Sequence, residues 1–372
     1  MNKKRIAFLL YVHNPDDERV WYQQAESLRE TNNDVFLISS ISEKSQFPNT
    51  ICFNNRAKPA KKTIKKFIEI LLRIEPDKII CDNPISIIAA KRYKKQISGK
   101  PIIIYDITEW YPSKKNLVNL SFFKKIFKFV ILLFISYYAG FVSDKFIFGE
   151  CYKAKPFKML FPWKKYIFLS YYAYFKQIKS YPIRDISKQC ELLYSGNLTK
   201  EKGFYYVLNV VKLLAENNPE TDFILKIISK ETFEDSEIKN YKNLTIKLLE
   251  TLSFLNFCEE IGKSDICFDL RKIDFENTRC LPIKIFYYMA AGRPVIYSNL
   301  KAIRKSIPEI NKFGLLVNPN ESKTIQQQIE RYLKDFSSYK QSCENARKLA
   351  ETKYNWDNIK LRFVNFIEEN GQ

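Results

Sequence analysis

The chain has 372 residues, 46% of them hydrophobic, and a net charge of +20. This length exceeds the roughly 250 to 300 residues at which a single core stops growing, so two domains are expected, and the hydrophobic content excludes extended disorder. Eight scattered cysteines without a Cys-x-x-Cys pair, together with a single histidine, exclude a zinc constellation and indicate a reducing compartment.

The chain opens on an apolar run, Arg5–Val12, which we interpret as a buried strand because acidic residues rather than a cleavage site follow it. Short β-branched or aromatic runs then alternate with segments of helical periodicity. This alternation predicts parallel βαβ units with helices on both faces of each sheet. The further predicted strands are Asp34–Ser39, Lys78–Cys81, Pro101–Tyr105, Lys145–Phe148, Glu191–Tyr194, Asp222–Ile228, Leu244–Leu248, Asp265–Leu270, Pro294–Tyr297 and Gly314–Val317.

Positive charge is concentrated in the first half of the chain. Residues 1–180 hold 32 Lys and Arg against 15 Asp and Glu, or +17, whereas residues 181–372 hold 29 against 26, or +3. Two segments, Ala60–Glu75 and Ser121–Tyr137, combine lysines with an apolar face at helical spacing, which favours an anionic membrane surface over nucleic acid. The alternative is that the lysines form only a solvated face. The uncharged run Phe129–Ser143 is too short to predict a membrane span.

A polar segment without periodicity, Lys176–Lys188, is the predicted linker. We therefore expect an N-terminal doubly wound domain over residues 1–180, a second one over residues 181–355, and a cleft between them. Two helical patterns, Ser338–Lys353 and Trp356–Glu369, end the chain. The second of them, within residues 356–372, is expected to pack back onto the first domain.

Ligands of open α/β sheets bind beyond the carboxyl ends of the strands, so the segments after each strand are the candidate site. After the first strand, Asp17 and Arg19 are predicted to face the cleft; the alternative is that Asn14 or Asp16 caps a helix and Arg19 is a surface residue. No glycine precedes Gly99, so the first domain has no dinucleotide fingerprint and no phosphate-cradling loop.

Two carboxylates and a threonine follow the strand that ends near Tyr105, in the order Asp106, Thr108 and Glu109. Polar side chains in this position are suited to hold sugar hydroxyls, although residues of these types also begin helices. In the second domain, the strand ending at Ser195 is followed by a glycine turn and a helix start. A helix N-terminus with Lys200 or Lys202 beside it is an anion site.

Several segments together carry a family resemblance. "DERVWYQQAESL" with "DVFLIS", "YDITEWYP", "YSGNLTKEKG", "LPIKIFYYMAAGRPVIYS", "GLLVNPNE" and "YNWDNI" resemble, in order and spacing, the family 4 glycosyltransferases with the GT-B fold. The similarity is greatest to bacterial enzymes of surface-polysaccharide assembly. It implies two Rossmann-like domains that face a central cleft, with the nucleotide sugar on the C-terminal domain and the C-terminal helix crossing back.

The resemblance also implies roles for individual positions. Lys202 matches the second member of a basic pair that holds the donor diphosphate, and Asn197 stands where the first, usually Arg, is found. Tyr287 stands at the position of a ribose-binding Glu, Arg279 at that of a second Glu, and Thr108 at that of a His that contacts the donor sugar. The further donor-binding positions are Gly196, Leu281, Pro282, Ile283 and Lys284, and the resemblance implies that backbone amides around Cys280–Ile283 meet the diphosphate.

The expected function is transfer of a sugar from a nucleoside-diphosphate sugar to a lipid-linked or surface-polysaccharide acceptor, with retention. We expect Asp106, Thr108 and Glu109 at the reaction centre and His13, Asp17 and Arg19 on the acceptor side. No metal or other cofactor is expected, and the protein is expected to be cytoplasmic and peripheral at the inner face of the cell membrane. The alternative is a non-catalytic homologue that serves as partner subunit of an active glycosyltransferase.

Overall fold

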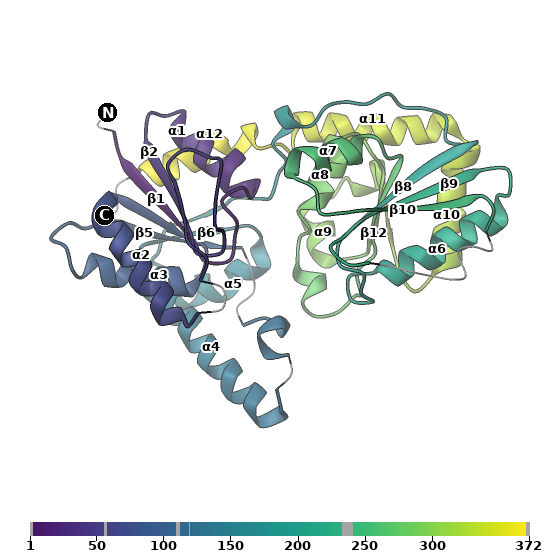
Figure 1. Ribbon diagram of the computed structural model, residues 1–372. Helices are drawn as coiled ribbons and strands as arrows, with labels where there is room; N and C mark the ends of the chain where they lie inside the picture. The colour runs from purple at the N-terminus through teal and green to yellow at the C-terminus, as the bar shows by residue number, and fades with distance from the viewer. Residues whose placement is uncertain (1–2, 56–57, 109–111, 119, 233–240, 370–372) are drawn as a thin grey trace. The chain divides into compact units, whose positions relative to one another are not determined.

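The computed structural model describes residues 3–55, 58–108, 112–118, 120–232 and 241–369. The chain divides into two compact units: unit 1 is Met1–Ser170 with Ile359–Gln372, and unit 2 is Tyr171–Asn358. Each unit contains a parallel sheet with helices on both faces (Figure 1), as the alternation of strand and helix patterns predicts. The boundary at Ser170 precedes the predicted linker, so that linker segment belongs to unit 2.

The described residues of unit 1 form a seven-stranded parallel sheet in the order β3-β2-β1-β4-β5-β6-β7. The middle of this sheet is buried on both faces, which explains why its strands are continuous apolar runs rather than alternating ones. Its strands are β1 (Arg5–Leu10), β2 (Asp34–Ser39), β3 (Thr50–Cys52), β4 (Lys78–Cys81), β5 (Ile102–Ile107), β6 (Lys145–Phe148) and β7 (Tyr166–Phe168). The helices are the π-helix η1 (Arg19–Ala25), α1 (Glu26–Arg29), α2 (Ala60–Ile74), α3 (Pro84–Lys94), the 3₁₀ helix η2 (Lys114–Leu117), α4 (Phe122–Val142) and α5 (Cys151–Leu160).

Helix α2 has the two faces that its sequence predicts, but its apolar face is covered. Ile64, Phe67 and Leu71 are buried in the core of unit 1, while Lys61 and Lys65 are exposed. The apolar side chains of α2 therefore stabilise the core and are not available to a membrane. This finding corrects the interpretation of α2 as one of two amphipathic helices suited to a membrane surface.

The C-terminal helix α12 (Asp357–Glu368) packs on unit 1, as predicted. Its side chains Phe363 and Ile367 are buried. Two lysines on β4 and β6, the strands on either side of β5, are almost fully buried and donate to its last carbonyls: Lys78 and Lys145. Lys145 Nζ lies 2.9 Å from the carbonyl oxygen of Phe366. Cations at a helix C-terminus satisfy carbonyls that have no partner within the helix, and this explains two lysines inside an apolar sheet.

The described residues of unit 2 form a six-stranded parallel sheet in the order β10-β9-β8-β11-β12-β13. Its core includes side chains of β8, β9 and α6. The strands are β8 (Gln189–Ser195), β9 (Asp222–Ile228), β10 (Leu244–Leu249), β11 (Ile266–Asp269), β12 (Val295–Ser298) and β13 (Gly314–Val317). The helices are η3 (Phe175–Gln177), α6 (Phe204–Asn217), α7 (Phe254–Gly262), η5 (Asn277–Arg279), α8 (Lys284–Ala290), α9 (Lys301–Ser306), η6 (Ile310–Lys312), α10 (Ser322–Lys334) and α11 (Phe336–Thr352).

Candidate functional site

A buried cluster of charges lies at the carboxyl edge of the unit 2 sheet. Asp269 ends β11, and its carboxylate accepts from Nε of Arg271 at 2.6 Å and from Nη2 at 3.0 Å. The hydroxyl of Tyr297, on the adjacent strand β12, lies 3.3 Å from Oδ2. Burial would raise the pKa of Asp269, but Arg271 and Lys284 hold it below its usual range. The carboxylate is therefore ionised and shared between two cations.

Lys284 is the first residue of α8 and points into this cluster. Its Nζ lies 3.7 Å from Oδ2 of Asp269 and donates to the carbonyl oxygen of Ser195, the last residue of β8. The side chain is 19% exposed. Burial lowers the pKa of Lys284; the charge of Asp269 opposes this, and Arg271 and Lys202 add to it. Two cations thus surround one carboxylate, and a positive charge is left over at this edge of the sheet.

The glycine turn after β8 has a shape that other residues could not adopt. Gly203 has a φ of +87°, and a Cβ at this position would lie 1.7 Å from the carbonyl oxygen of Leu270. Gly196 also has a positive φ, and a Cβ there would lie 3.8 Å from Nζ of Lys284. The loop between these two glycines is therefore held against the segment after β11. It brings the predicted residues Gly196 and Lys202 to the neighbourhood of Lys284.

The other predicted donor positions behave differently. Tyr287 is only 1% exposed, and its ring packs edge-on against Phe254 with centroids 5.4 Å apart. Arg279 stacks on the ring of Phe275 at 3.8 Å and donates to the carbonyl oxygen of the same residue. Each of these two side chains therefore packs against an aromatic ring.

Three donor positions lie just before α8. Leu281 and Pro282 are buried, and Ile283 is half-buried as the N-cap of α8. Asn197 lies in the turn after β8, where its carbonyl oxygen accepts from the hydroxyl of Tyr194 at 2.7 Å. These positions follow β8 or precede α8, so they belong to the same sheet edge as Lys284.

The predicted residues of unit 1 form two buried ion pairs. Arg19 Nη2 lies 2.8 Å from Oδ1 of Asp106, and both side chains are less than a tenth exposed. Gln24 also donates to Asp106, at 2.8 Å. His13 Nδ1 lies 3.1 Å from Oδ2 of Asp82. The carboxylate of Asp106 is therefore engaged inside the protein rather than turned outward to a substrate.

A small cavity lies beside these pairs. It is lined by His13, Arg19, Asp82, Asp106 and Thr108 among others, and its volume of about 10 Å³ is about that of one water molecule. It brings together four of the predicted residues, but it has no room for a sugar in this structure. Asp17 lies outside the lining and accepts the backbone amide of Arg19 at 3.0 Å. Glu109 lies outside the described residues.

Sequence reasoning missed four polar residues that the structure places at these sites. Asp82 directly follows β4, and Asp269 ends β11; both strands are predicted, so examining every strand end would have found these two carboxylates. Arg271 and Gln24 carry no such signal, because their roles depend on which carboxylate lies near them in the fold.

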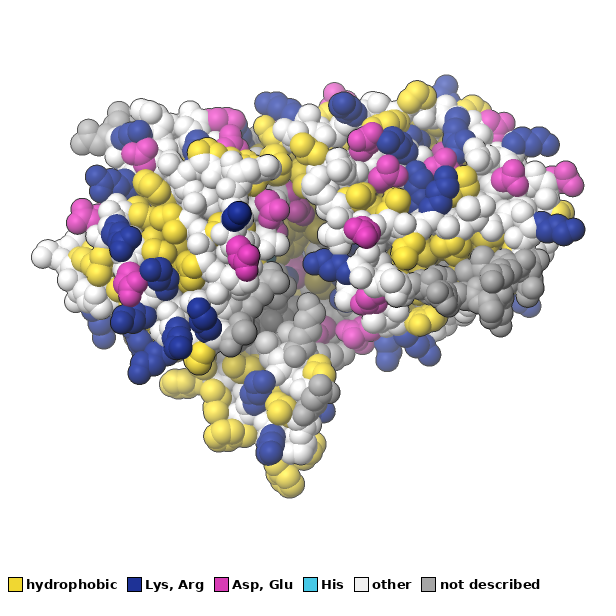
Figure 2. Space-filling view, in the orientation of Figure 1, with side chains coloured by type: hydrophobic (Ala, Val, Ile, Leu, Met, Phe, Trp, Pro, Cys, Tyr) yellow, Lys and Arg dark blue, Asp and Glu magenta, His cyan; other side chains and the backbone are white. Residues whose placement is uncertain are grey.

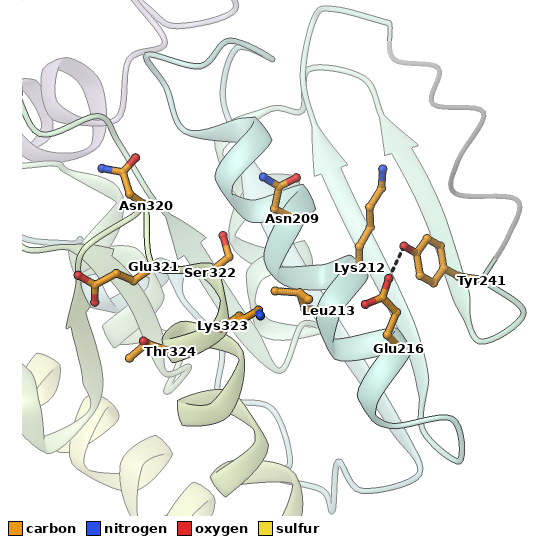
Figure 3. Close-up of a pocket in the computed structure, with 10 residues that line it drawn as sticks. All are labelled: Asn209, Lys212, Leu213, Glu216, Tyr241, Asn320, Glu321, Ser322, Lys323 and Thr324. Atoms are coloured by element: carbon orange, nitrogen blue, oxygen red, sulfur yellow. Dashed lines mark hydrogen bonds between the residues drawn. The ribbon is translucent and has the colours of Figure 1, made fainter.

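A larger hollow opens elsewhere on unit 2, between α6, the start of α10 and Tyr241 (Figure 3). Its volume is about 600 Å³. The hydroxyl of Tyr241 donates to Glu216 at 2.8 Å, and the lining holds Lys212 and Lys323 as well as Glu321. None of the predicted donor residues lines it. Within the described parts of both units, no group of three or more His, Cys, Asp or Glu is placed to hold a metal ion.

Comparison with known proteins adds a family match for part of the chain. Residues 189–335 match the model of the glycosyl transferases group 1 family. A stretch of 162 residues is 26% identical to an uncharacterized glycosyltransferase of Haemophilus influenzae, covering 43% of this chain and 44% of that protein. A stretch of 198 residues is 26% identical to one of Methanocaldococcus jannaschii, covering 50% and 46%. The matches thus span less than half the length of these curated relatives.

Solved structures resemble the chain over nearly its whole length. Sucrose-phosphate synthase from Thermosynechococcus elongatus has a TM-score of 0.69 at 15% identity, with 98% of each chain covered. Anabaena HepE in complex with UDP-glucose has a TM-score of 0.69 at 14% identity, covering 98% of this chain and 99% of that one. WaaG, a glycosyltransferase involved in lipopolysaccharide biosynthesis, has a TM-score of 0.68 at 14% identity, covering 98% and 100%. The predicted GT-B fold, with two Rossmann-like domains, is confirmed.

Proposed function

We propose that this protein is a glycosyltransferase that moves a sugar from a nucleoside-diphosphate sugar to a lipid-linked or membrane-proximal saccharide. The observation that carries the proposal is the charge imbalance at the carboxyl edge of unit 2, where Arg271 and Lys284 surround the single carboxylate of Asp269. The match of residues 189–335 to the glycosyl transferases group 1 family supports it.

The charge cluster is suited to a diphosphate. A buried ammonium that is short of negative charge has a lowered pKa, as Lys284 does. A bound diphosphate would supply that charge and raise the pKa of the lysine. Lys202, whose charge acts on Lys284, would add a second cation. Developing negative charge on a leaving diphosphate would be stabilised by the same groups, which is how preorganised charges lower a barrier.

By resemblance to the family 4 glycosyltransferases, we assign acceptor binding to unit 1. The same resemblance implies that the reaction retains the configuration of the transferred sugar. In that scheme the leaving diphosphate helps to deprotonate the incoming hydroxyl on the same face, so no strong protein nucleophile is needed. The protein then contributes positioning and charge stabilisation. The buried pair of Arg19 and Asp106 would act here by shaping the strand ends rather than by touching the sugar.

A thermal-shift and calorimetry series tests the donor site. A nucleoside diphosphate at 100 times its Kd should stabilise the protein by about 2.7 kcal/mol, which corresponds to a rise in Tm of about 5 to 10 °C for a domain the size of unit 2. Lys284→Met should weaken binding at least about tenfold. Lys323→Met, which changes a lysine of the hollow between α6 and α10, is the matched control and should bind as the wild type does.

The outcomes separate three cases. Binding that depends on Lys284 but not on Lys323, with sugar transfer to a lipid-linked acceptor, supports the proposal. Binding that is lost in the Lys323 variant instead would move the donor site to the hollow. If no nucleoside diphosphate or nucleotide sugar shifts the Tm, the donor-site assignment is wrong.

A further inference from the structure

Helix α4 carries an exposed apolar surface of unusual extent. Among the described residues, ten of the 25 exposed large hydrophobic side chains lie on this single helix. Hydrophobic side chains, with Lys or Arg side chains among them, gather over the part of α4 that projects from unit 1 (Figures 1 and 2). Soluble proteins rarely expose contiguous apolar surface on this scale unless it binds something. Of the helices described, α4 alone is long and apolar enough to cross a membrane, by length and composition.

Five of these ten exposed side chains form a stripe along the helix. With 3.6 residues per turn, positions 123, 127, 130, 134 and 141 lie on the same side, and all five side chains are exposed, from 55% at Val130 to 83% at Phe123. The lysines of the helix, Lys124, Lys125 and Lys128, lie on the other side. The helix is therefore amphipathic about its own axis, with aromatic residues opposite a row of positive charges.

The C-terminal end of α4 is firmly held by unit 1. Small residues Ala139 and Gly140 are buried, and a Cβ on Gly140 would lie 2.7 Å from the ring of Phe161. Lys164 caps the end of the helix, with Nζ 2.7 Å from the carbonyl oxygen of Gly140. The first turns have no such anchor, because every residue from Ser121 to Ile131 is exposed. The apolar stripe is thus carried by a helix that unit 1 holds at its C-terminal end and that is exposed over its first turns.

A transmembrane orientation is excluded by the chain path. Strands β5 and β6 are neighbours in the sheet, with Ile107 opposite Phe148, so the chain leaves the sheet after β5 and returns to it through α4. If α4 crossed a bilayer, the segment before it would have to cross as well. That segment contains Ser113, Asn116 and a short 3₁₀ helix, and irregular polar backbone is not found exposed to lipid in the hydrocarbon region. Helix α4 can therefore only lie along a surface.

We infer that α4 is a monotopic membrane anchor, which lies in one leaflet of an anionic bilayer with its aromatic stripe among the acyl chains. The positive charge of this segment favours an anionic bilayer as the binding partner. Residues 110–143 contain five lysines and neither Asp nor Glu, so the lysines can extend to lipid phosphates while the stripe is buried.

Residues at the end of α5 and just after it extend the same surface. Met159 and Trp163 are exposed, and the ring of Trp163 packs edge-on against Phe161, which in turn adjoins Gly140 of α4. Tryptophan is enriched at the level of lipid headgroups, so Trp163 is expected at the boundary of the bilayer. This inference does not depend on the donor site of the proposed glycosyl transfer, and it is tested without any substrate.

The test is flotation of the full-length protein with vesicles of phosphatidylcholine alone and of phosphatidylcholine with phosphatidylglycerol, at low and physiological salt. The wild type should float with both, more strongly with the anionic vesicles, and should keep much of its binding at physiological salt. Phe123→Ser with Phe134→Ser should lower partitioning at least about 50-fold, because two large side chains no longer leave water. Leu361→Ser with Leu248→Ser, which changes exposed apolar residues of α12 and β10, is the control and should bind normally.

Two further variants test the roles of α2 and of Trp163 in membrane binding. Replacement of the exposed lysines of α2 by Gln, at Lys61, Lys62 and Lys65, should leave most binding intact, because α2 offers no apolar face. Trp163 emission should shift to the blue with vesicles, and Trp163→Phe should remove that change. Circular dichroism melts establish that each variant is folded.

Three results would overturn the inference. Binding abolished by salt and equal in the wild type and the Phe variant would show electrostatic attachment without insertion. Loss of binding in the α2 variant alone would place the membrane surface on α2. Absence of vesicle binding, with a dimer in sedimentation that the Phe variant dissociates, would make α4 an interface between copies.

Discussion

His13→Gln is expected to remove a pH-dependent part of the stability of unit 1. His13 Nδ1 lies 3.1 Å from Oδ2 of Asp82, whose carboxylate also accepts the backbone amides of Tyr11 and His13. Burial alone would lower the pKa of His13, but the hydrogen bond and charge of Asp82, with the charges of Asp17 and Asp106, raise it from 6.5 to about 9. The imidazolium is therefore part of the folded structure at neutral pH.

The direction of the pH dependence follows from that shift. Because the folded-state pKa lies above the unfolded one, the stabilisation is complete below pH 6.5, declines as the pH rises, and is lost above about pH 9. At about 1.4 kcal/mol per pH unit the shift corresponds to about 3 kcal/mol. The wild type should therefore exceed His13→Gln in the free energy of unfolding by about 3 kcal/mol more at pH 6 than at pH 9.5.

Urea unfolding followed by tryptophan fluorescence measures this difference. Trp356 belongs to unit 2, while the other three tryptophans belong to unit 1, so a Trp356→Phe background makes the signal report on unit 1. Lys78, with a pKa lowered to about 7 by burial and by neighbouring Lys4 and Lys145, changes stability in the opposite direction between pH 7 and 10. That effect is the same in both proteins and cancels. If the wild type exceeds His13→Gln in the free energy of unfolding by the same amount at pH 6 and at pH 9.5, the conclusion that His13 is charged in the folded protein is wrong.

Two other substitutions test the unit 2 site. Lys202→Ala should weaken nucleoside-diphosphate binding about tenfold in calorimetry, whereas Lys200→Ala, on the exposed side of the same loop, should change it little; equal losses in both would mean only a diffuse charge effect. Gly203→Ala should destabilise unit 2 by at least about 3 kcal/mol, because its Cβ would meet the backbone of Leu270 at 1.7 Å. Gly99→Ala, whose Cβ would lie 3.5 Å from its nearest neighbour, should stay within about 0.5 kcal/mol of the wild type in urea unfolding.

The fold is accessible from the sequence because most of its strands, such as β4, β6, β11 and β12, are buried on both faces. Such strands are continuous apolar runs bounded by polar residues, and their alternation with helical patterns predicts both doubly wound sheets. The sequence did not reveal β3 and β7, which have three residues each and lie at the two edges of the unit 1 sheet. Edge strands bury little surface, so their composition differs little from that of a loop.

The sites show where sequence reasoning ends. The turn at Gly196 and the lysines Lys202 and Lys284 are recognisable because glycine turns and helix starts have local signatures. Pairing between distant residues has none. Arg19 and Asp106 are 87 positions apart, and only the fold reveals that their side chains form an ion pair. Likewise, α2 and α4 have similar patterns of lysine and apolar residues, but the core covers the apolar face of α2 and leaves that of α4 exposed.

Tyr287 offers a final test, because the glycosyltransferases that the chain resembles carry a ribose-binding Glu at this position. The Tyr287 ring lies between Phe254 and Phe257, with centroids 5.4 and 6.5 Å away, and is 1% exposed. Tyr287→Glu would replace this packing with a buried carboxylate, at a cost of about 3 to 5 kcal/mol in the free energy of unfolding.

Tyr287→Phe keeps the ring and removes only the hydroxyl, so it should cost no more than about 1.5 kcal/mol. Urea unfolding of both variants measures these costs, and calorimetry with a nucleoside diphosphate measures affinity under conditions where both are folded. If the position is part of the aromatic core, Tyr287→Glu lowers stability without raising affinity, and the ribose is held by other groups. A Glu variant that is as stable as the Phe variant and binds the nucleotide more tightly would show that this side chain can reach the ligand, and the packing argument would be wrong.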